Sequence, residues 1–165
     1  MEKIGPIEKV YEAYSAIADN RVRISEGENS AEVESSDRQK SYTITWTENL
    51  YTSNDNASYW QGYAGYPILA VLMLQGKLPL DRAVMEHFRD IDWHQLNEKH
   101  KRDYAAATQE AIAAKGLDPN EAKNAAEKVI EGLRTLDIVV KRGNCAHRKP
   151  VNEERRLAAS FLKEK

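Results

Sequence analysis

Only one cysteine, Cys145, occurs in the 165-residue chain, so no disulfide can form within it and no metal site can consist of cysteines alone. The longest apolar run, residues 67–74, is far shorter than the roughly 20 residues that cross a bilayer. The start of the chain also lacks the basic-then-apolar pattern of a secretion signal. These absences predict a soluble, cytoplasmic protein without a membrane partner.

The common sequence signatures of catalysis are missing as well. The chain has no GxxxxGK(S/T) phosphate loop, no GxGxxG, no HExxH, no GxSxG and no EF-hand loop. The usual basis for predicting nucleotide-dependent, zinc-protease or α/β-hydrolase chemistry is therefore lacking, and we predict no cofactor. With 41% apolar and 30% charged residues, the composition is that of an ordinary globular protein of one domain.

Residues 1–66 are predicted to form a helix followed by an antiparallel sheet. Apolar side chains recur at helical spacing through residues 7–17. The spacing then changes to two, which predicts half-buried strands around residues 21–24, 31–34 and 42–46.

The first predicted hairpin has a register that satisfies both faces of the sheet. With a loop at residues 26–29, Val22 lies opposite Val33 on the apolar face. The outer face then pairs opposite charges, Arg21 with Glu34 and Arg23 with Glu32. A second loop at residues 36–41 places Val33 opposite Ile44.

Glu48 is the carboxylate that the predicted sheet places in the most aromatic surroundings. A turn at residues 53–56 and a fourth strand over residues 58–63 place Glu48 opposite Gln61 and beside tyrosines. Desolvation by such neighbours raises the pKa of a carboxyl group, which suits a general acid or base. In the alternative interpretation, Glu48 faces water and the aromatic residues pack beneath helices. The predicted ligand site consists of Trp46, Glu48, Tyr59, Gln61 and Tyr63.

Residues 67–165 are predicted to contain four to five helices. Residues 93–115 have the pattern of one helix that Gly116 ends, whereas residues 138–140 fit either an edge strand or the end of a helix. Four residues are predicted helix N-caps: Asp81, Asp92, Asp118 and Asn152. The fold class is therefore α+β, a single domain with an antiparallel meander of three or four strands and a helical second half.

Two further groups of residues suggest chemistry. Cys145 lies two residues from His147 among arginines, and nearby positive charge lowers the pKa of a thiol. Residues two apart need not touch, however, and the alternative is an inert cysteine. His94 and Glu98 lie one helical turn apart and could both bind a divalent metal, but a solvated helix surface often has this spacing. We predict no metal site.

Positive charge is concentrated at the end of the chain. Residues 134–165 hold 9 Lys/Arg and 4 Asp/Glu, whereas residues 1–60 hold 6 and 11. This basic C-terminal region can follow a phosphate backbone or pair with the acidic first part of the chain. The predicted nucleic-acid contacts are Lys141, Arg142, Arg148 and Lys149, although no known nucleic-acid-binding motif accompanies them.

Because no enzyme signature is present, we expect a small cytosolic binding or adaptor protein with a small polar ligand or a protein partner. One alternative is a nucleic-acid-binding protein that uses its basic C-terminal region. The other is an enzyme in which Glu48 acts as acid or base in an aromatic pocket. Salt-dependent binding to nucleic acid would favour the first alternative, and a concave site shared by Glu48, Tyr59 and Tyr63 would favour the second.

Overall fold

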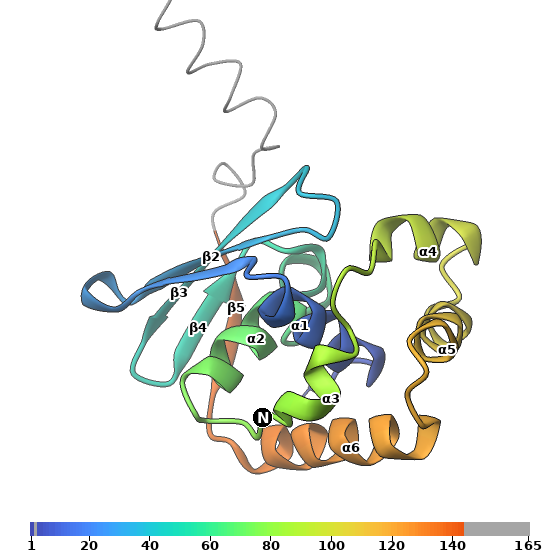
Figure 1. Cartoon of the computed structure of the whole chain (residues 1–165). Helices are drawn as coiled ribbons and strands as arrows, with labels where there is room; N and C mark the ends of the chain where they lie inside the picture. The colour runs from blue at the N-terminus through green and yellow to red at the C-terminus, as the bar shows by residue number, and fades with distance from the viewer. Residues whose placement is uncertain (2, 144–165) are drawn as a thin grey trace, which may run out of the picture.

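The computed structural model of the chain describes residue 1 and residues 3–143 (Figure 1). As predicted, the fold is α+β: a helix, then a sheet, then a series of helices. The helices are α1 (Glu8–Ala18), α2 (Tyr66–Leu74), α3 (Arg82–Glu86), α4 (Trp93–Lys99), α5 (Tyr104–Ala114) and α6 (Pro119–Thr135), with the short turns η1 (Glu26–Glu28) and η2 (Ala57–Gln61). The strands are β1 (Val22–Ser25), β2 (Ser30–Glu34), β3 (Ser41–Thr47), β4 (Leu50–Ser53) and β5 (Val139–Arg142).

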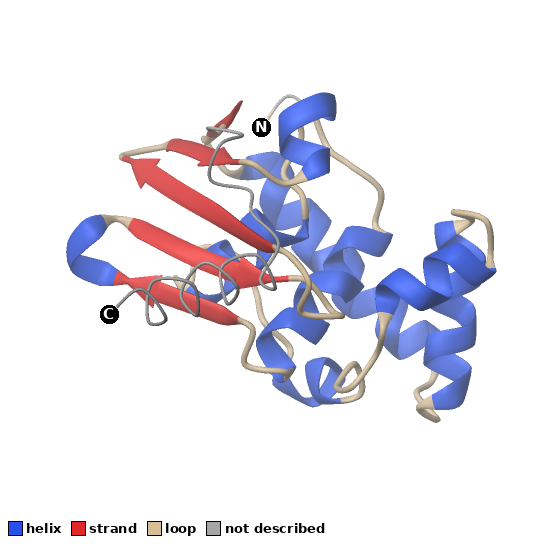
Figure 2. Cartoon of the chain, turned by 90° about the horizontal axis from the view of Figure 1, so that it is seen from above, coloured by secondary structure: helices blue, strands red, loops and turns tan. Residues whose placement is uncertain are grey.

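The strands lie in the order β1-β2-β3-β4-β5, and the first four form an antiparallel meander, of which β1, β2 and β3 are strands that the sequence predicts. β5 joins the sheet beside β4 and parallel to it, after the chain has passed through the helices (Figure 1). Val139 and Val140 therefore belong to an edge strand and do not extend α6. The six α-helices lie on one side of the sheet, where α2 packs on the strands and α1 packs on α2 (Figure 2).

The first hairpin has the predicted register, with Arg23 opposite Glu32. Arg23 reaches past this partner, and its Nη2 donates to Glu34 Oε1 at 3.0 Å. The backbone of Arg21 also lies opposite Glu34, whose N–H donates to the Arg21 carbonyl at 3.0 Å. The Arg21 side chain, however, is buried and does not reach the Glu34 carboxylate on the outer face.

The pairing of β2 with β3 differs from the prediction by two residues. Val33 lies opposite Tyr42 instead of Ile44. The turn is tighter than expected because the Asp37 carboxylate accepts a hydrogen bond from the Ser35 hydroxyl at 2.7 Å. A shift of two residues keeps each side chain on its predicted face of the sheet, because the side-chain period of a strand is two.

The predicted fourth strand is wrong. β3 ends at a turn that contains Glu48, whose backbone is left-handed (φ 54°), and β4 follows directly. Residues 58–63 contain most of η2 and do not pair with β3. η2 begins here because Asp55 accepts hydrogen bonds from the backbone N–H groups of Ser58 (3.2 Å) and Tyr59 (2.8 Å).

The single helix predicted over residues 93–115 is also wrong, because the chain forms α4 and α5 with a bend between them. Lys101 and Arg102 have left-handed backbones (φ 53° and 66°), which α-helices do not tolerate. Asp103 then caps α5 by accepting the Ala106 N–H at 3.2 Å. The caps at Asp81, Asp92 and Asp118 are confirmed, whereas Asn152 lies outside the described residues.

Ser15 of α1 connects the core to the helical half. Its hydroxyl donates to the Phe88 carbonyl at 2.6 Å and accepts from Trp93 Nε1 at 2.7 Å. The ring of Tyr11 stacks on Phe88 with 5.2 Å between centroids. These contacts fix the start of α4 against α1. Within the described part of the chain, no helix has the length and apolar content needed to span a membrane.

Candidate functional site

A pocket of about 970 Å³ lies between α1, the β2–β3 turn, the segment around η2 and α4. Its lining residues come from four stretches of chain, within residues 9–21, 35–42, 55–66 and 93–104. Because these stretches are distant in the sequence, the pocket exists only in the folded protein.

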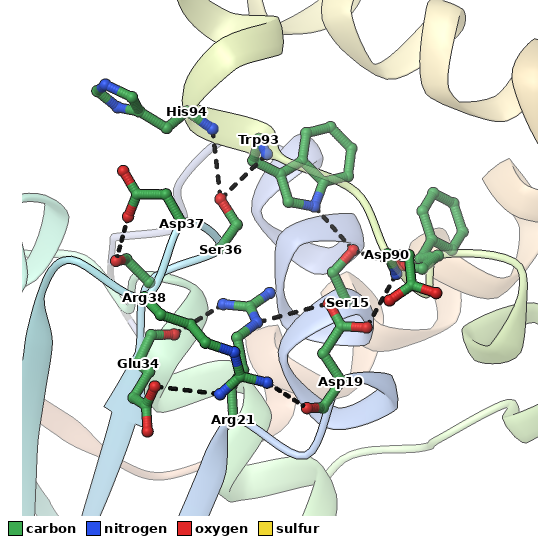
Figure 3. Close-up of polar contacts among 12 residues, drawn as sticks. Ser15, Asp19, Arg21, Glu34, Ser36, Asp37, Arg38, Asp90, Trp93 and His94 are labelled. Carbon is green, nitrogen blue, oxygen red and sulfur yellow. Dashed lines mark hydrogen bonds and ion pairs between the residues drawn. The ribbon is translucent and has the colours of Figure 1, made fainter.

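Ser36 holds two walls of this pocket together. Its Oγ accepts hydrogen bonds from the backbone N–H groups of Trp93 (3.0 Å) and His94 (3.3 Å), which are otherwise unpaired at the start of α4 (Figure 3). The neighbouring Asp37 lines the same wall. Burial by itself raises the pKa of Asp37, but hydrogen bonds from Ser35 and the Gln39 N–H outweigh burial and lower it.

Arg21 is the most deeply buried charge in the pocket lining, with a side chain that is 1% exposed. Its Nη1 donates to the Glu34 carbonyl at 2.7 Å. The Asp19 carboxylate lies 3.6 Å from Nε, which is within ion-pair range but too long for a hydrogen bond. Neither Nε nor Nη2 has a hydrogen-bond partner among the described residues.

A second arginine, Arg38, lies on the outer side of this cluster (Figure 3). Its guanidinium donates to Glu34 Oε2 and to the Asp19 carbonyl, both at 3.1 Å. Because Arg23 takes the other Glu34 oxygen, the Glu34 carboxylate is used by the two surface arginines. Among residues 1 and 3–143, the Arg21 guanidinium therefore has polar contacts only with the backbone carbonyl of Glu34 and, at longer distance, the Asp19 carboxylate.

Lys9 and Glu12 of α1 form the second charged pair of the pocket. Lys9 Nζ lies 2.9 Å from Glu12 Oε2, and Glu12 Oε1 accepts from Asn97 Nδ2 at 3.4 Å. Burial by itself lowers the pKa of Lys9, but the neighbouring Glu12 carboxylate outweighs burial and raises it. Lys9 Nζ also lies 5.1 Å from the centroid of the Tyr104 ring. Glu12 therefore favours the charged form of Lys9, and residues of α4 and α5 contact this pair.

Tyrosines and Asp55 form the opposite wall. Burial raises the pKa of Tyr66 well above its usual value, and its neighbour Tyr42 acts in the same direction. The two rings meet edge to face with 6.4 Å between centroids. The Asp55 carboxylate accepts from Ser53, and a side chain at Gly65 would collide with it. This wall therefore offers neutral tyrosine hydroxyls beside a carboxylate that is already hydrogen-bonded.

The structure divides the predicted ligand site. Gln61 and Tyr63 line the pocket, together with Trp60. Trp46 instead stacks on Tyr51 with 6.1 Å between centroids, and the guanidinium of Arg142 lies 5.0 Å from the Tyr59 centroid. Glu48 is exposed in the β3–β4 turn and does not line the pocket. These differences follow from the wrong register, because residues 58–63 do not pair with the strand that contains Trp46.

Of the remaining predicted residues, His94 and Glu98 line this pocket from α4. His94 Nε2 lies 3.1 Å from Glu98 Oε1 on an exposed helix face, and within residues 1 and 3–143 no group of three or more possible ligands could hold a metal ion. Lys141 and Arg142 are exposed on β5. Four predicted residues lie outside the described residues: Cys145, His147, Arg148 and Lys149.

Sequence reasoning missed the pocket because its charged groups carry no local signal. The alternation of polar and apolar residues along the first strand predicts that the Arg21 side chain points to the outer face of the sheet, as that of Arg23 does. Instead, Arg21 precedes the first residue of β1 and turns beneath Ser36, which belongs to another turn. From their spacing in the sequence, Lys9 and Glu12 are predicted to lie on the solvent-facing polar side of α1.

Over residues 2–139, the chain matches the model of a family described as "Uncharacterised conserved protein UCP014422". This span contains every residue that lines the pocket. No curated protein and no solved structure matches the chain.

Proposed function

We propose that this chain, which belongs to the family of conserved proteins UCP014422, binds a small molecule in the pocket between α1, the β2–β3 turn and α4. The observation that carries the proposal is the convergence of buried charges and aromatic rings on one cavity of about 970 Å³. Ligand sites typically enclose about 300–1,000 Å³ and combine apolar walls with a few polar groups that orient the ligand.

The proposal retains a binding function and moves the site away from the residues that the sequence favoured. An acid–base role for Glu48 has no support, because its exposed side chain lies outside the pocket. Nucleic-acid binding by the basic C-terminal region stays a separate prediction, since Arg148 and Lys149 lie outside the described residues.

The test is a screen of small polar aromatic compounds against the isotope-labelled full chain by nuclear magnetic resonance. Compounds that bind are expected to shift backbone amide signals within residues 35–42, 55–66 and 93–104. Binding that shifts only signals elsewhere, or a complete lack of binding, would contradict the proposal.

A pair of variants checks that the pocket itself is occupied. Ala57 lines the pocket, so Ala57→Phe is expected to fill part of it and weaken every compound that binds there. Ala83 is exposed on α3, and Ala83→Phe adds the same ring outside the pocket. The control variant is expected to bind as the wild-type protein does. Equal affinity of both variants for the compounds would place their binding outside this pocket.

A further inference from the structure

We infer that the ligand of this pocket carries a carboxylate or phosphate group, which Arg21 binds through the free edge of its guanidinium; this inference rests on the proposed binding function. Carboxylates and phosphates share the chemistry that matters here, a pair of negatively charged oxygens that can accept two parallel hydrogen bonds.

The interaction partners of the charged lining residues are the first reason. Four acidic residues line the pocket, and each has a partner: Glu12 with Lys9, Asp37 with Ser35, Asp55 with Ser53, and Glu98 with His94. Four cations line it as well: Lys9, Arg21, Lys40 and Arg102. Within the described part of the chain, the side chains of Lys40 and Arg102 have no ion-pair partner among these acids. The acids of the lining thus already have hydrogen-bond or ion-pair partners, whereas two of its cations are left to interact with a ligand.

The geometry of Arg21 is the second reason. Its Nε and Nη2 lie on one edge of a planar group, and both are buried without a hydrogen-bond partner among the described residues, with the Asp19 carboxylate 3.6 Å from Nε. This edge matches two oxygens of one carboxylate or phosphate. A buried guanidinium edge without hydrogen bonds is unfavourable, so an anion that reaches it gains more than it would at the surface.

The surroundings of Arg21 explain how its charge can be buried in the fold. Asp19 Oδ2 lies 3.6 Å from Nε and offsets part of the charge. The other oxygen of Asp19 accepts the Asp90 N–H at 2.9 Å, which holds the carboxylate in place without a hydrogen bond to Arg21. Lys9 is a weaker candidate, because Glu12 already takes its ammonium group at 2.9 Å.

Trp60 suggests what the rest of the ligand contacts. Its side chain belongs to a residue that is 65% exposed, and it lines the pocket at its rim. A flat exposed ring of this kind can stack on a planar group of a bound molecule. Small aromatic acids are therefore suitable probes, because one end fits Arg21 and the other can reach the aromatic side chains.

The experiment compares three probes of similar shape on the wild-type full chain: benzoate, phenyl phosphate and the neutral benzamide. Titrations followed by amide signals are expected to show at least one of the anions binding about tenfold or more tightly than benzamide, with shifts around Arg21 and Ser36. The stronger of the two anions identifies the preferred group.

Benzamide that binds in the pocket as tightly as both anions would overturn this inference and leave the proposed binding function intact. Failure of all probes and of all screened compounds to shift pocket signals would overturn both. These comparisons use the wild-type chain, so they decide the inference even where a variant does not fold.

Two matched variants then assign the effect to Arg21. Arg21→Lys keeps the positive charge and removes the planar edge, and it is expected to weaken the preferred anion about tenfold or more. Arg38→Lys makes the same change on the neighbouring arginine, which contacts Asp19 and Glu34 but does not line the pocket. It is expected to leave anion binding unchanged. Equal losses in both variants, with both folded, would exclude Arg21 as the anchor.

Discussion

Arg21 and Glu48 show how strongly a single residue depends on its surroundings. Moving a guanidinium out of water costs several kcal/mol, and the Glu34 carbonyl and the Asp19 carboxylate offset part of that cost for Arg21. Glu48 carries a different cost, because its left-handed backbone (φ 54°) crowds a side chain that has a Cβ atom. Arg21 keeps two N–H groups without hydrogen-bond partners in the described structure. Glu48 serves only to form the β3–β4 turn.

Glu48→Gly is expected to stabilise the protein by about 0.5–1 kcal/mol. Glycine adopts the left-handed conformation without the Cβ crowding, and Glu48 is exposed, so no packing is lost. The free energy of unfolding in urea measures the effect. Glu28→Gly is the matched control, because Glu28 is exposed and does not have a positive φ. It is expected to be neutral or destabilising, and a gain in both variants would contradict this explanation.

At the level of elements, the break between α4 and α5 shapes the pocket. A continuous helix would carry residues 93–115 straight, whereas the bend at Lys101 and Arg102 turns α5 back toward α1. Tyr104 then lies beside Lys9, and Arg102 lines the pocket. The bend before Asp103 therefore places Arg102 and Tyr104 in the pocket lining.

Asp103→Ala is expected to lower the free energy of unfolding by about 1 kcal/mol, because the Ala106 N–H loses its side-chain acceptor. The amide signals of α5 are expected to shift most. Asp137→Ala removes an exposed carboxylate from a residue that caps no helix, and we expect it to change stability by less than about 0.5 kcal/mol. Equal effects of the two substitutions would show that the cap is not the cause.

For the whole molecule, buried tyrosines connect stability to alkaline pH. Burial raises the pKa of Tyr11 to about 12, with smaller contributions from Glu8 and Glu127. Burial also raises the pKa values of Tyr14 and Tyr66. In the unfolded chain these hydroxyls ionise near pH 10. The folded protein therefore favours the neutral form of three core or pocket tyrosines.

The free energy of unfolding is expected to fall as pH rises above about 10. Below that pH both states keep the tyrosine protons, so the full stability is present. Above it the unfolded chain releases protons that the folded chain retains, and stability falls by up to roughly 1.4 kcal/mol per pH unit for each such tyrosine. Urea unfolding at a series of alkaline pH values measures this loss. Complete tyrosine ionisation near pH 10 in a chain that remains folded would contradict it.

The sequence by itself determined the features whose causes lie within a few residues. The caps at Asp81, Asp92 and Asp118 need only the next turn of chain, and the first hairpin needs only its own two strands. The order of a helix, a meander and further helices also follows from local periodicity, and it specifies the α+β fold class.

Only the tertiary structure decided where the pocket lies and which residues enter it. Gln61 and Tyr63 were predicted as ligand contacts, but their place in the lining depends on η2, which replaced the expected strand. Arg21 alternates like an exposed residue, but the folded chain buries its side chain, which donates to the Glu34 carbonyl and lies beside Asp19 (Figure 3). The segments that line the pocket are far apart in sequence, so no local pattern records their contact, and packing alone brings the charges together.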